Sequence, residues 1–396
     1  MEEEKVAYES ISLWLPLPYR VLLLFIIGLW LFSLNLHLFH SVQIDISPFL
    51  RYTRSSTESP LHHSVYLFAG ILSTIFSLNL LLFWSLTHQS PDLVRQWQIL
   101  PISLYSIFLL VFLWPTSFLR RGRLRFLRTL RRILIGGIDR DTRFADVLLA
   151  DALTSYSKVL SDFATVLCMF FSGYSATDPI PDRSCGGAFL VPCVISIPYL
   201  IRFRQCITEY QRGAGKMQLL NALKYASAFP VIILGALEKN YMMQEYVTRR
   251  ELAAGWYIAV VCNSGFAFWW DVSMDWNLSI FSGGSNAEDG PKPWGLRKRL
   301  HYKDKGFYYT AILLDLVMRC AWSVKLSVHL DFLNEMEGGI FMLELLEVCR
   351  RWVWVFFRVE KEWVAREGGG YEMVNIEEGV GKVEGHVGVN KEARED

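Results

Sequence analysis

The sequence lacks the features that usually mark catalytic or metal-binding proteins. Its seven cysteines include no C-x-x-C pair and no zinc-ligand spacing, and His37, His40, His62 and His63 match no metal signature either. No set of nucleophile, base and oxyanion donors is recognisable. RGAGKM at 212–217 lacks the first glycine and the Ser or Thr of a phosphate loop. We therefore expect no enzyme activity, no cofactor and no metal.

A net charge is also nearly absent, because 40 Lys and Arg side chains stand against 39 Asp and Glu, for a formal charge of +1. The charges are segregated along the chain, so their placement carries more information than their sum. Hydrophobic residues make up 52% of the chain and aromatic residues 14%. With long apolar runs, this composition predicts an all-α, polytopic membrane bundle and excludes a soluble globular domain.

The apolar runs define the expected organisation. A polar N-terminus (1–20) has no small-residue cleavage site after it, so the first apolar run is expected to be a spanning anchor. N-terminal transmembrane helices (21–119), a basic amphipathic cytosolic segment (120–143), a transmembrane domain (144–364) and a disordered, Gly-rich acidic tail (365–396) follow. About nine to ten spans are expected. They lie near 21–40, 65–87, 99–119, 144–171, 188–201, 218–237, 253–270, 307–329 and 340–357.

Two local features leave alternatives open. The run at 188–201 is short and bounded by Pro192 and Pro198, so it is expected either to break or to extend into the polar residues after it. Cys185 and Cys193 either pair across a short non-cytosolic loop or remain free thiols in apolar surroundings.

The basic segment holds nine arginines between Arg120 and Arg143, with leucines at helical spacing among them. This pattern is typical of a helix that lies on an anionic membrane surface. If it faces the cytosol, the loops expected on the outside (173–187, 238–252, 330–339) carry four Lys and Arg, against ten in the inside loops 202–217 and 271–306. The charge bias places the C-terminus in the cytosol and leaves the N-terminal side open.

Charges inside the apolar segments are the main functional signal. The stretch ELLEVCRRWVWVFFRVE, from Glu344 to Glu360, is apolar enough for a bilayer yet carries Glu347, Arg350 and Arg351. On a helix, Glu347 reaches both arginines at i+3 and i+4. Charges at such depth need protein partners or water. Either they form an ion pair that only fixes helix packing, or they belong to an anion site, to which arginine presents a fixed fork of donors.

Further charges recur at helical spacing in the neighbouring segments. Asp151, Ser155, Lys158 and Asp162 form one predicted polar stripe, and Asp271 with Asp275 share a helix face. Asp315 and Arg319 are again i and i+4, whereas Lys224 lies one turn inside a span and is expected either to line the same site or to reach the interface. Cations on several helices, held by carboxylates, fit a path for an oxyanion.

These segments together resemble the EXS-domain family. The resemblance rests on FADVLLADALTS (144–155), RFRQCITEYQ and NALKYASAFP within 202–230, WWDVSMDWNL (269–278), YYTAILLDLVMRCAW (308–322) and LELLEVCRRWVWVFFRVEKEW (343–363). It covers about 140–365, and the W-D-x3-D-W and E-x2-R-R-x2-W-x2-F-R-x-E patterns are its most specific parts. The family includes fungal Golgi proteins of the ER-retention-defective type and the phosphate exporters of plants and animals. With about 20 residues before its first span, the chain looks like the short branch without the SPX domain.

The resemblance implies a Golgi membrane transporter of inorganic phosphate that returns lumenal phosphate to the cytosol and supports protein retention and glycosylation. The implied phosphate path consists of Asp151, Lys224, Asp271, Asp275, Arg319, Trp322, Glu347, Arg350 and Arg351. Thr154 is a departure, because exporters often carry Asn there. The expected partners are phosphate and the lipid bilayer, with a homodimer possible and no nucleic acid. The alternative is a non-transporting adaptor that retains glycosyltransferases through its cytosolic loops and tail.

Overall fold

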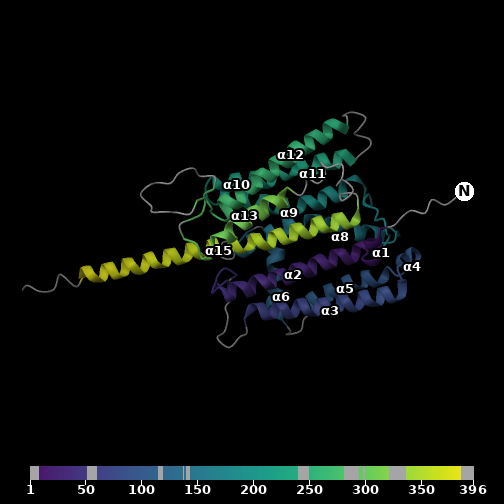
Figure 1. The fold of residues 1–396 in the computed structure, drawn as a ribbon, viewed down its shortest axis with the longest axis horizontal. Helices are drawn as coiled ribbons and strands as arrows, with labels where there is room; N and C mark the ends of the chain where they lie inside the picture. Colours follow the sequence, from purple (N-terminus) through teal and green to yellow (C-terminus); the bar gives the residue numbers. More distant parts are fainter. Residues whose placement is uncertain are drawn as a thin grey trace, which may run out of the picture.

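A computed structural model describes residues 9–50, 60–114, 119–136, 138–139, 143–239, 249–280, 294–297, 299–320 and 336–384. Every regular element in these ranges is a helix, as predicted (Figure 1). Six segments of the described chain are long and apolar enough to cross a membrane. They are Leu17–Ser41, Leu61–Thr87, Pro91–Leu113, Gly187–Gln211, Met217–Glu238 and Arg250–Asp275. Of the other segments expected to span, 144–171 is divided between two helices, 307–329 lies partly outside the described residues, and 340–357 carries several charges. The predicted total of nine to ten spans stays a prediction.

The helices follow one another as an elongated bundle with near-parallel axes (Figure 1). The first part of the chain holds α1 (Ser10–Trp14), α2 (Leu17–Ser41), α3 (Leu61–Thr87), α4 (Pro91–Gln96), α5 (Ile99–Leu113), α6 (Arg120–Arg131) and the π-helical η1 (Arg132–Gly136). The rest holds α7 (Arg143–Ser155), α8 (Ser157–Phe171), α9 (Gly187–Gln211), α10 (Met217–Ala226), α11 (Ala228–Lys239), α12 (Arg249–Trp270), the π-helical η3 (Asp271–Asp275), α13 (Lys305–Arg319) and α15 (Glu337–Glu384).

Two large apolar cores hold the bundle together. In the first, Tyr19 of α2 packs with Leu72 and Phe83 of α3 and Leu104 of α5. In the second, Trp354 and Phe357 of α15 are buried with Phe39, Trp276 and Tyr308 from α2, the segment after η3 and α13. Both α2 and α15 are thus central helices, and α15 carries its charged motif through the interior of the bundle.

Several helices differ from their predicted extents. The span predicted at 144–171 is divided at Tyr156, where α7 ends and α8 begins. Of the predicted polar stripe, Asp151, Ser155 and Asp162 are buried, whereas Lys158 is exposed. Of the alternatives for 188–201, the extended one is confirmed: α9 continues through both prolines to Gln211. Helix α15 runs to Glu384, well past the predicted start of disorder at 365, because extending a formed helix costs far less than starting one.

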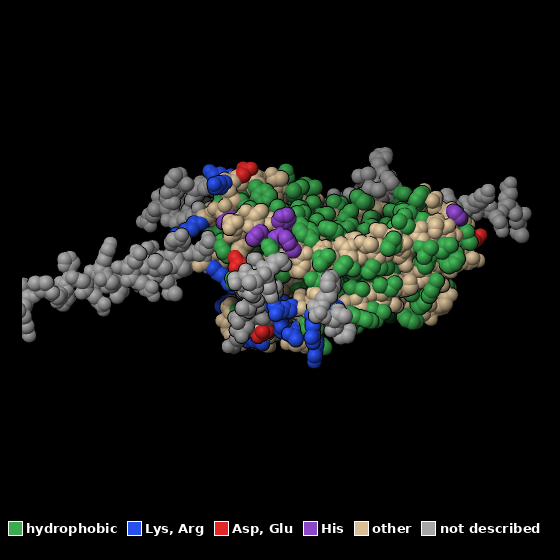
Figure 2. All heavy atoms as spheres, turned by 90° about the horizontal axis from the view of Figure 1, so that it is seen from below, with side chains coloured by type: hydrophobic (Ala, Val, Ile, Leu, Met, Phe, Trp, Pro, Cys, Tyr) green, Lys and Arg blue, Asp and Glu red, His purple; other side chains and the backbone are tan. Residues whose placement is uncertain are grey.

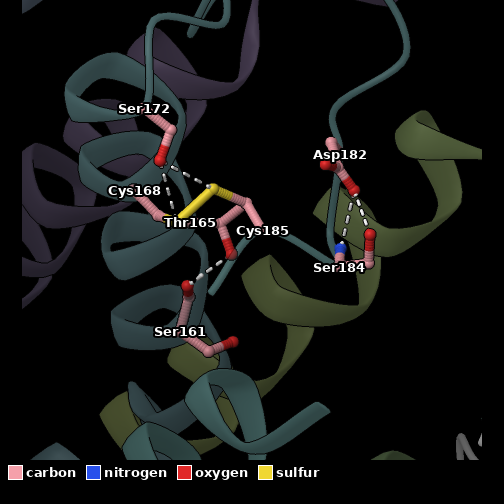
Figure 3. The surroundings of a disulfide bond; sticks show 7 residues. All are labelled: Ser161, Thr165, Cys168, Ser172, Asp182, Ser184 and Cys185. Atoms are coloured by element: carbon pink, nitrogen blue, oxygen red, sulfur yellow. Dashed lines mark hydrogen bonds between the residues drawn. A yellow bond between two sulfur atoms is a disulfide. The ribbon is translucent and has the colours of Figure 1, made fainter. Parts of the chain in front are cut away.

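A disulfide joins Cys168 of α8 to Cys185 in the segment that leads to α9 (Figure 3). The pairing of Cys185 with Cys193 is therefore wrong, and Cys193 is a free, exposed thiol. The reason is geometric. Cys193 lies inside α9, whereas the chain after α8 folds back and brings Cys185 beside the last turn of α8.

The first and the last described residues lie at opposite ends of the molecule (Figure 1). Glu9 accepts hydrogen bonds from the backbone N–H groups of Glu337 (2.9 Å) and Gly338 (3.1 Å), so the segment before α1 lies against the N-terminus of α15. An acidic side chain there complements the helix dipole. The N-terminal segment and the start of α15 thus occupy one end, and α15 continues from the other.

Side chains on one long face fit a membrane-embedded body. Figure 2 shows hydrophobic side chains over most of that face, with Lys and Arg gathered toward the end from which α15 continues. Histidines also gather there: the rings of His37 and His62 stack at 4.7 Å, and His40 and His63 are next to His62. Within the described residues, no group of His, Cys, Asp and Glu is arranged to hold a metal ion.

Candidate functional site

Charged side chains from α7, α9, α10, η3, α13 and α15 meet inside the bundle. We call this group the central charged cluster. It contains Asp151, Arg202, Lys224, Asp271, Asp275, Asp315, Arg319, Glu347, Arg350 and Arg351. All the predicted path residues belong to it except Trp322, which lies outside the described residues. Its five cations and five carboxylates balance, so the empty cluster carries no large uncompensated charge.

Asp271 and Asp275 are brought together by a π-helical turn. The N–H of Trp276 donates to the carbonyl of Asp271 (2.8 Å), an i+5 bond that ends α12 in one wide turn. Such turns often occur at functional sites. Both carboxylates then face Lys224, whose Nζ lies 3.8 Å from Asp271 and 3.6 Å from Asp275. Lys224 is buried rather than reaching the interface, and the ring of Trp270 lies 5.6 Å from its Nζ.

Arg350 is the most heavily paired cation of the cluster. Its guanidinium donates to Glu347 one turn earlier on α15 (Nε to Oε2, 2.9 Å), to Asp315 of α13 (3.0 Å) and to Asp271 (3.4 Å). Arg319 shares the last two partners, since it pairs with Asp271 and lies 3.0 Å from Asp315. Arg350 is only 4% exposed. Three carboxylates therefore fix it between α12, α13 and α15.

Arg351 is held in a different way. Its Nε donates to Ser155 Oγ (2.9 Å) and its Nη2 to Thr154 Oγ1 (3.2 Å), while its guanidinium lies 4.6 Å from the ring centre of Trp354. Ser155 in turn donates to Glu347 (2.7 Å). Among the described side chains, no carboxylate forms an ion pair with Arg351. Of the two arginines within reach of Glu347 on the helix, Arg350 is the one that pairs with it. Arg351 is only partly buried, and its two hydrogen bonds use two of its five N–H donors.

Asp151 has partners that the sequence reasoning missed. It accepts from Arg202 Nε (2.6 Å) and from the hydroxyl of Tyr225 (2.5 Å), and all three side chains are buried. Arg202 follows an apolar run in RFRQ, where an arginine normally marks the end of a span. The sequence could have indicated this position of Arg202 only through the alternative in which the helix extends beyond Pro198. In the structure α9 does extend there, and it carries Arg202 into the bundle.

The arrangement suits binding of an oxyanion more than catalysis. Guanidinium and ammonium groups supply charge-assisted donors, and the surrounding carboxylates orient them. Among the described residues of the cluster, Arg351 is the one cation that no carboxylate pairs with. An anion would therefore compete with hydroxyl groups, and not with a carboxylate, for Arg351.

Comparisons with known proteins find one family and several similar proteins. The profile of the EXS family matches residues 15–364, and so includes the N-terminal helices as well. Protein ERD1 homolog 2 of Schizosaccharomyces pombe is 28% identical over 389 residues, covering 87% of this chain and 96% of that protein. Protein ERD1 homolog 1 of the same organism is 30% identical, covering 88% and 90%. Solute carrier family 53 member 1 of Mus musculus is 27% identical over 84% of this chain, but over only 48% of its own length.

Proposed function

The chain belongs to the EXS family, and from this premise we propose that it transports inorganic phosphate across a membrane through the central charged cluster. Similarity to a protein named as a solute carrier supports transport. Phosphate is the substrate that the family resemblance implies, and its oxygens fit the planar fork of donors on Arg351.

The observation that carries this proposal is the contrast between Arg351 and its neighbours. Arg350, Arg319, Lys224 and Arg202 are all neutralised by carboxylates, whereas Arg351 is held by two hydroxyl groups and an aromatic ring. A cation that served packing alone would be expected to have a carboxylate partner at this depth, because an unpaired buried charge is costly. Arg351 is thus the first ligand of the anion in our account.

The other cations act as further weak sites. Arg319, Arg350 and Lys224 can exchange carboxylate for phosphate oxygens as the anion moves, while Asp151, Asp271, Asp275 and Glu347 keep them oriented. Several weak sites serve conduction better than one tight site, since the ion must also leave. We assign Trp322, which the structure does not describe, the role of a steric gate.

The membrane that we propose is that of the Golgi, with lumenal phosphate moving to the cytosol. Lumenal glycosylation consumes nucleotide sugars, and the phosphate finally released cannot cross hydrocarbon unaided. Effects on protein retention then follow from lumenal phosphate. The adaptor alternative is less well supported, because it gives no role to a cluster of buried charges in the bundle interior.

Flux of radiolabelled phosphate into proteoliposomes tests the proposal. Arg351→Ala should lower flux at low phosphate at least tenfold, because charge-assisted hydrogen bonds are worth about 1.5–3 kcal/mol and ~1.4 kcal/mol corresponds to tenfold. Arg95→Ala is the matched control: this partly exposed arginine pairs with Asp178, away from the cluster, and should retain flux. Equal flux in folded Arg351→Ala and wild-type protein would refute the role of Arg351.

A further inference from the structure

A second group of charges lies where α15 begins. We call it the end cluster: Arg20, Asp162, Arg183 and Glu337. Arg183 donates to Glu337 from Nε (3.1 Å) and Nη2 (3.0 Å) and to Asp162, while Arg20 lies 2.8 Å from Glu337. Arg183 precedes Ser184 and the disulfide-bonded Cys185, which ties this segment to α8 (Figure 3). The end cluster is therefore a fixed, ion-paired group at the end of the bundle where α15 begins.

Glu344 lies on α15 between the two clusters. It is seven residues beyond Glu337, three before Glu347 and seven before Arg351, spacings that place all four on one side of the helix. At ~1.5 Å per residue, Glu344 is about 10 Å along the helix from Glu337 and about 4.5 Å from Glu347. A solute that moves along this face from the end cluster to Arg351 passes Glu344.

Glu344 differs from every carboxylate of the two clusters. Its side chain is buried (5% exposed), and its buried Oε1 has no hydrogen-bond partner among the described residues. By contrast, Glu337 and Glu347 on the same helix are hydrogen-bonded by arginines. An ionised carboxylate with an orphaned oxygen is strongly disfavoured in such surroundings. The neutral acid is the form that this site tolerates.

The charged groups around Glu344 do not supply a dedicated partner. Those that act on it are Asp162 and Lys158 of α8, Arg183 of the disulfide-tethered segment and Arg20 of α2. Asp162 and Arg183 already pair with each other, Arg20 is paired with Glu337, and the Lys158 side chain is exposed. On α15 itself, the charged residues nearest to Glu344 in sequence on the same helix face are Glu337 and Glu347. Phe341 and Leu345, which flank Glu344 on α15, pack against the buried apolar side chains of Val21, Leu24 and Val159.

We propose, building on phosphate transport as the function, that Glu344 is a proton-binding site in the phosphate path, and that phosphate passes when it is protonated. The proton comes from water at the end cluster, binds a carboxylate oxygen of Glu344 and returns to water when the group ionises. In the neutral state Glu344 is a hydrogen-bonding group beside the path. In the ionised state it is an uncompensated negative charge that repels the anion before Arg351.

The first test compares flux by wild type and Glu344→Gln in proteoliposomes while the pH on the end-cluster side varies from about 5 to about 10, so that both protonation states of the buried carboxyl are sampled. Dividing the wild-type flux by the Glu344→Gln flux cancels the effect of pH on phosphate itself, because both proteins meet the same phosphate species. We expect this quotient to be near one at acid pH. Above the pKa of Glu344 it should fall about tenfold per pH unit, because the protonated fraction of Glu344 falls by that factor. Glu251→Gln, at an exposed position near the start of α12, is the matched control and should follow wild type.

The second test does not depend on transport. Infrared difference spectroscopy of the purified protein should show a carboxylic-acid C=O band that titrates in wild type, is absent from Glu344→Gln and shifts in Glu344→Asp. A flux ratio that is constant with pH, or a band that Glu344→Gln leaves unchanged, would overturn the proposal. If the band behaves as expected while wild-type vesicles show no phosphate flux, the proton site stands and the phosphate function is wrong. Should Glu344→Gln not fold, Glu344→Asp must still shift both the band and the pH dependence of flux, and no shift overturns the proposal.

Discussion

The two adjacent arginines of α15 have separate tasks because they point to different partners. Arg350 faces α12 and α13 and meets three carboxylates, whereas Arg351 faces α7 and meets Thr154 and Ser155. Ser155 connects the two, since it accepts from Arg351 and donates to Glu347, which Arg350 also contacts. One residue therefore holds the helices together and its neighbour remains available to the anion.

This division predicts unequal losses of stability for the two alanine substitutions. Arg350→Ala leaves Glu347, Asp315 and Asp271 without a shared cation, and removing one partner of a buried pair costs about 3–5 kcal/mol. Arg351→Ala removes only hydrogen bonds to hydroxyls, worth about 0.5–1.5 kcal/mol each. Thermal unfolding in detergent should show a large loss of melting temperature for Arg350→Ala and a small one for Arg351→Ala. Equal losses would contradict the division.

The sequence predicted which residues gather but not how they pair. Charges in apolar segments must avoid lipid, so Asp151, Arg319 and Arg350 could be assigned to the interior, whereas the position of Lys224 was left open. The pairing depends on which helices are neighbours, and spacing within one helix does not encode that. Two arginines of α15 are within reach of Glu347. Arg350 pairs with it and also contacts Asp315 of α13, whereas Arg351 contacts Ser155 of α7, so the neighbouring helices determine the pairing.

At the scale of elements, interruptions of helices shape the site. The π turn of η3 brings Asp271 and Asp275 toward Lys224. The break at Tyr156 lies between Ser155, which donates a hydrogen bond to Glu347, and Asp162, which forms an ion pair with Arg183. The sequence predicted neither interruption: the apolar pattern continues across Tyr156, and Asp271 with Asp275 were expected on one face of an ordinary helix. Helical periodicity therefore located the helical segments, but it did not predict which side chains lie on a common helix face beyond each break.

The start of α15 should make stability depend on pH. Burial disfavours the charge on Glu337, but hydrogen bonds from Arg183 and the charges of Arg183 and Arg20 outweigh it and hold the pKa of Glu337 below its usual 4.5. A lowered pKa in the folded state means that the unfolded state binds more protons at low pH. The stabilisation is thus complete above pH 4.5 and is lost as the pH falls through the lower, folded-state value.

The melting temperatures of wild type and Glu337→Gln, measured from neutral pH down to below pH 4.5, check the prediction. Wild type should melt at a higher temperature near neutral pH, and the difference should shrink as the pH falls below 4.5. A difference that stays constant into the acid range would show that Glu337 does not act through its charge.

For the whole molecule, the structure addresses a question that the sequence left open. Glu9 caps α15 at one end, while α15 continues from the other, where Lys and Arg gather (Figures 1 and 2). If the basic end faces the cytosol, as the positive-inside rule indicates, the N-terminal segment faces the lumen. The end cluster, with its disulfide, is then lumenal, on the oxidising side where disulfides persist.

The all-α membrane fold was predictable because it follows from run lengths and hydropathy, which the bilayer constrains strongly. The disulfide partner of Cys185 was not, because it depends on how the chain turns back after α8. Arg202 was overlooked for a similar reason: its depth depends on the continuation of α9 through Pro198. What the sequence could not supply is three-dimensional contact between segments far apart in the chain.

The most direct measurement of the central claim is an experimental density map of the protein determined with and without inorganic phosphate. The account predicts added density against Arg351, near the hydroxyls of Thr154 and Ser155, that appears only with phosphate and is missing in Arg351→Ala. Density confined to other surfaces, or density at Arg351 that does not depend on phosphate, would contradict it.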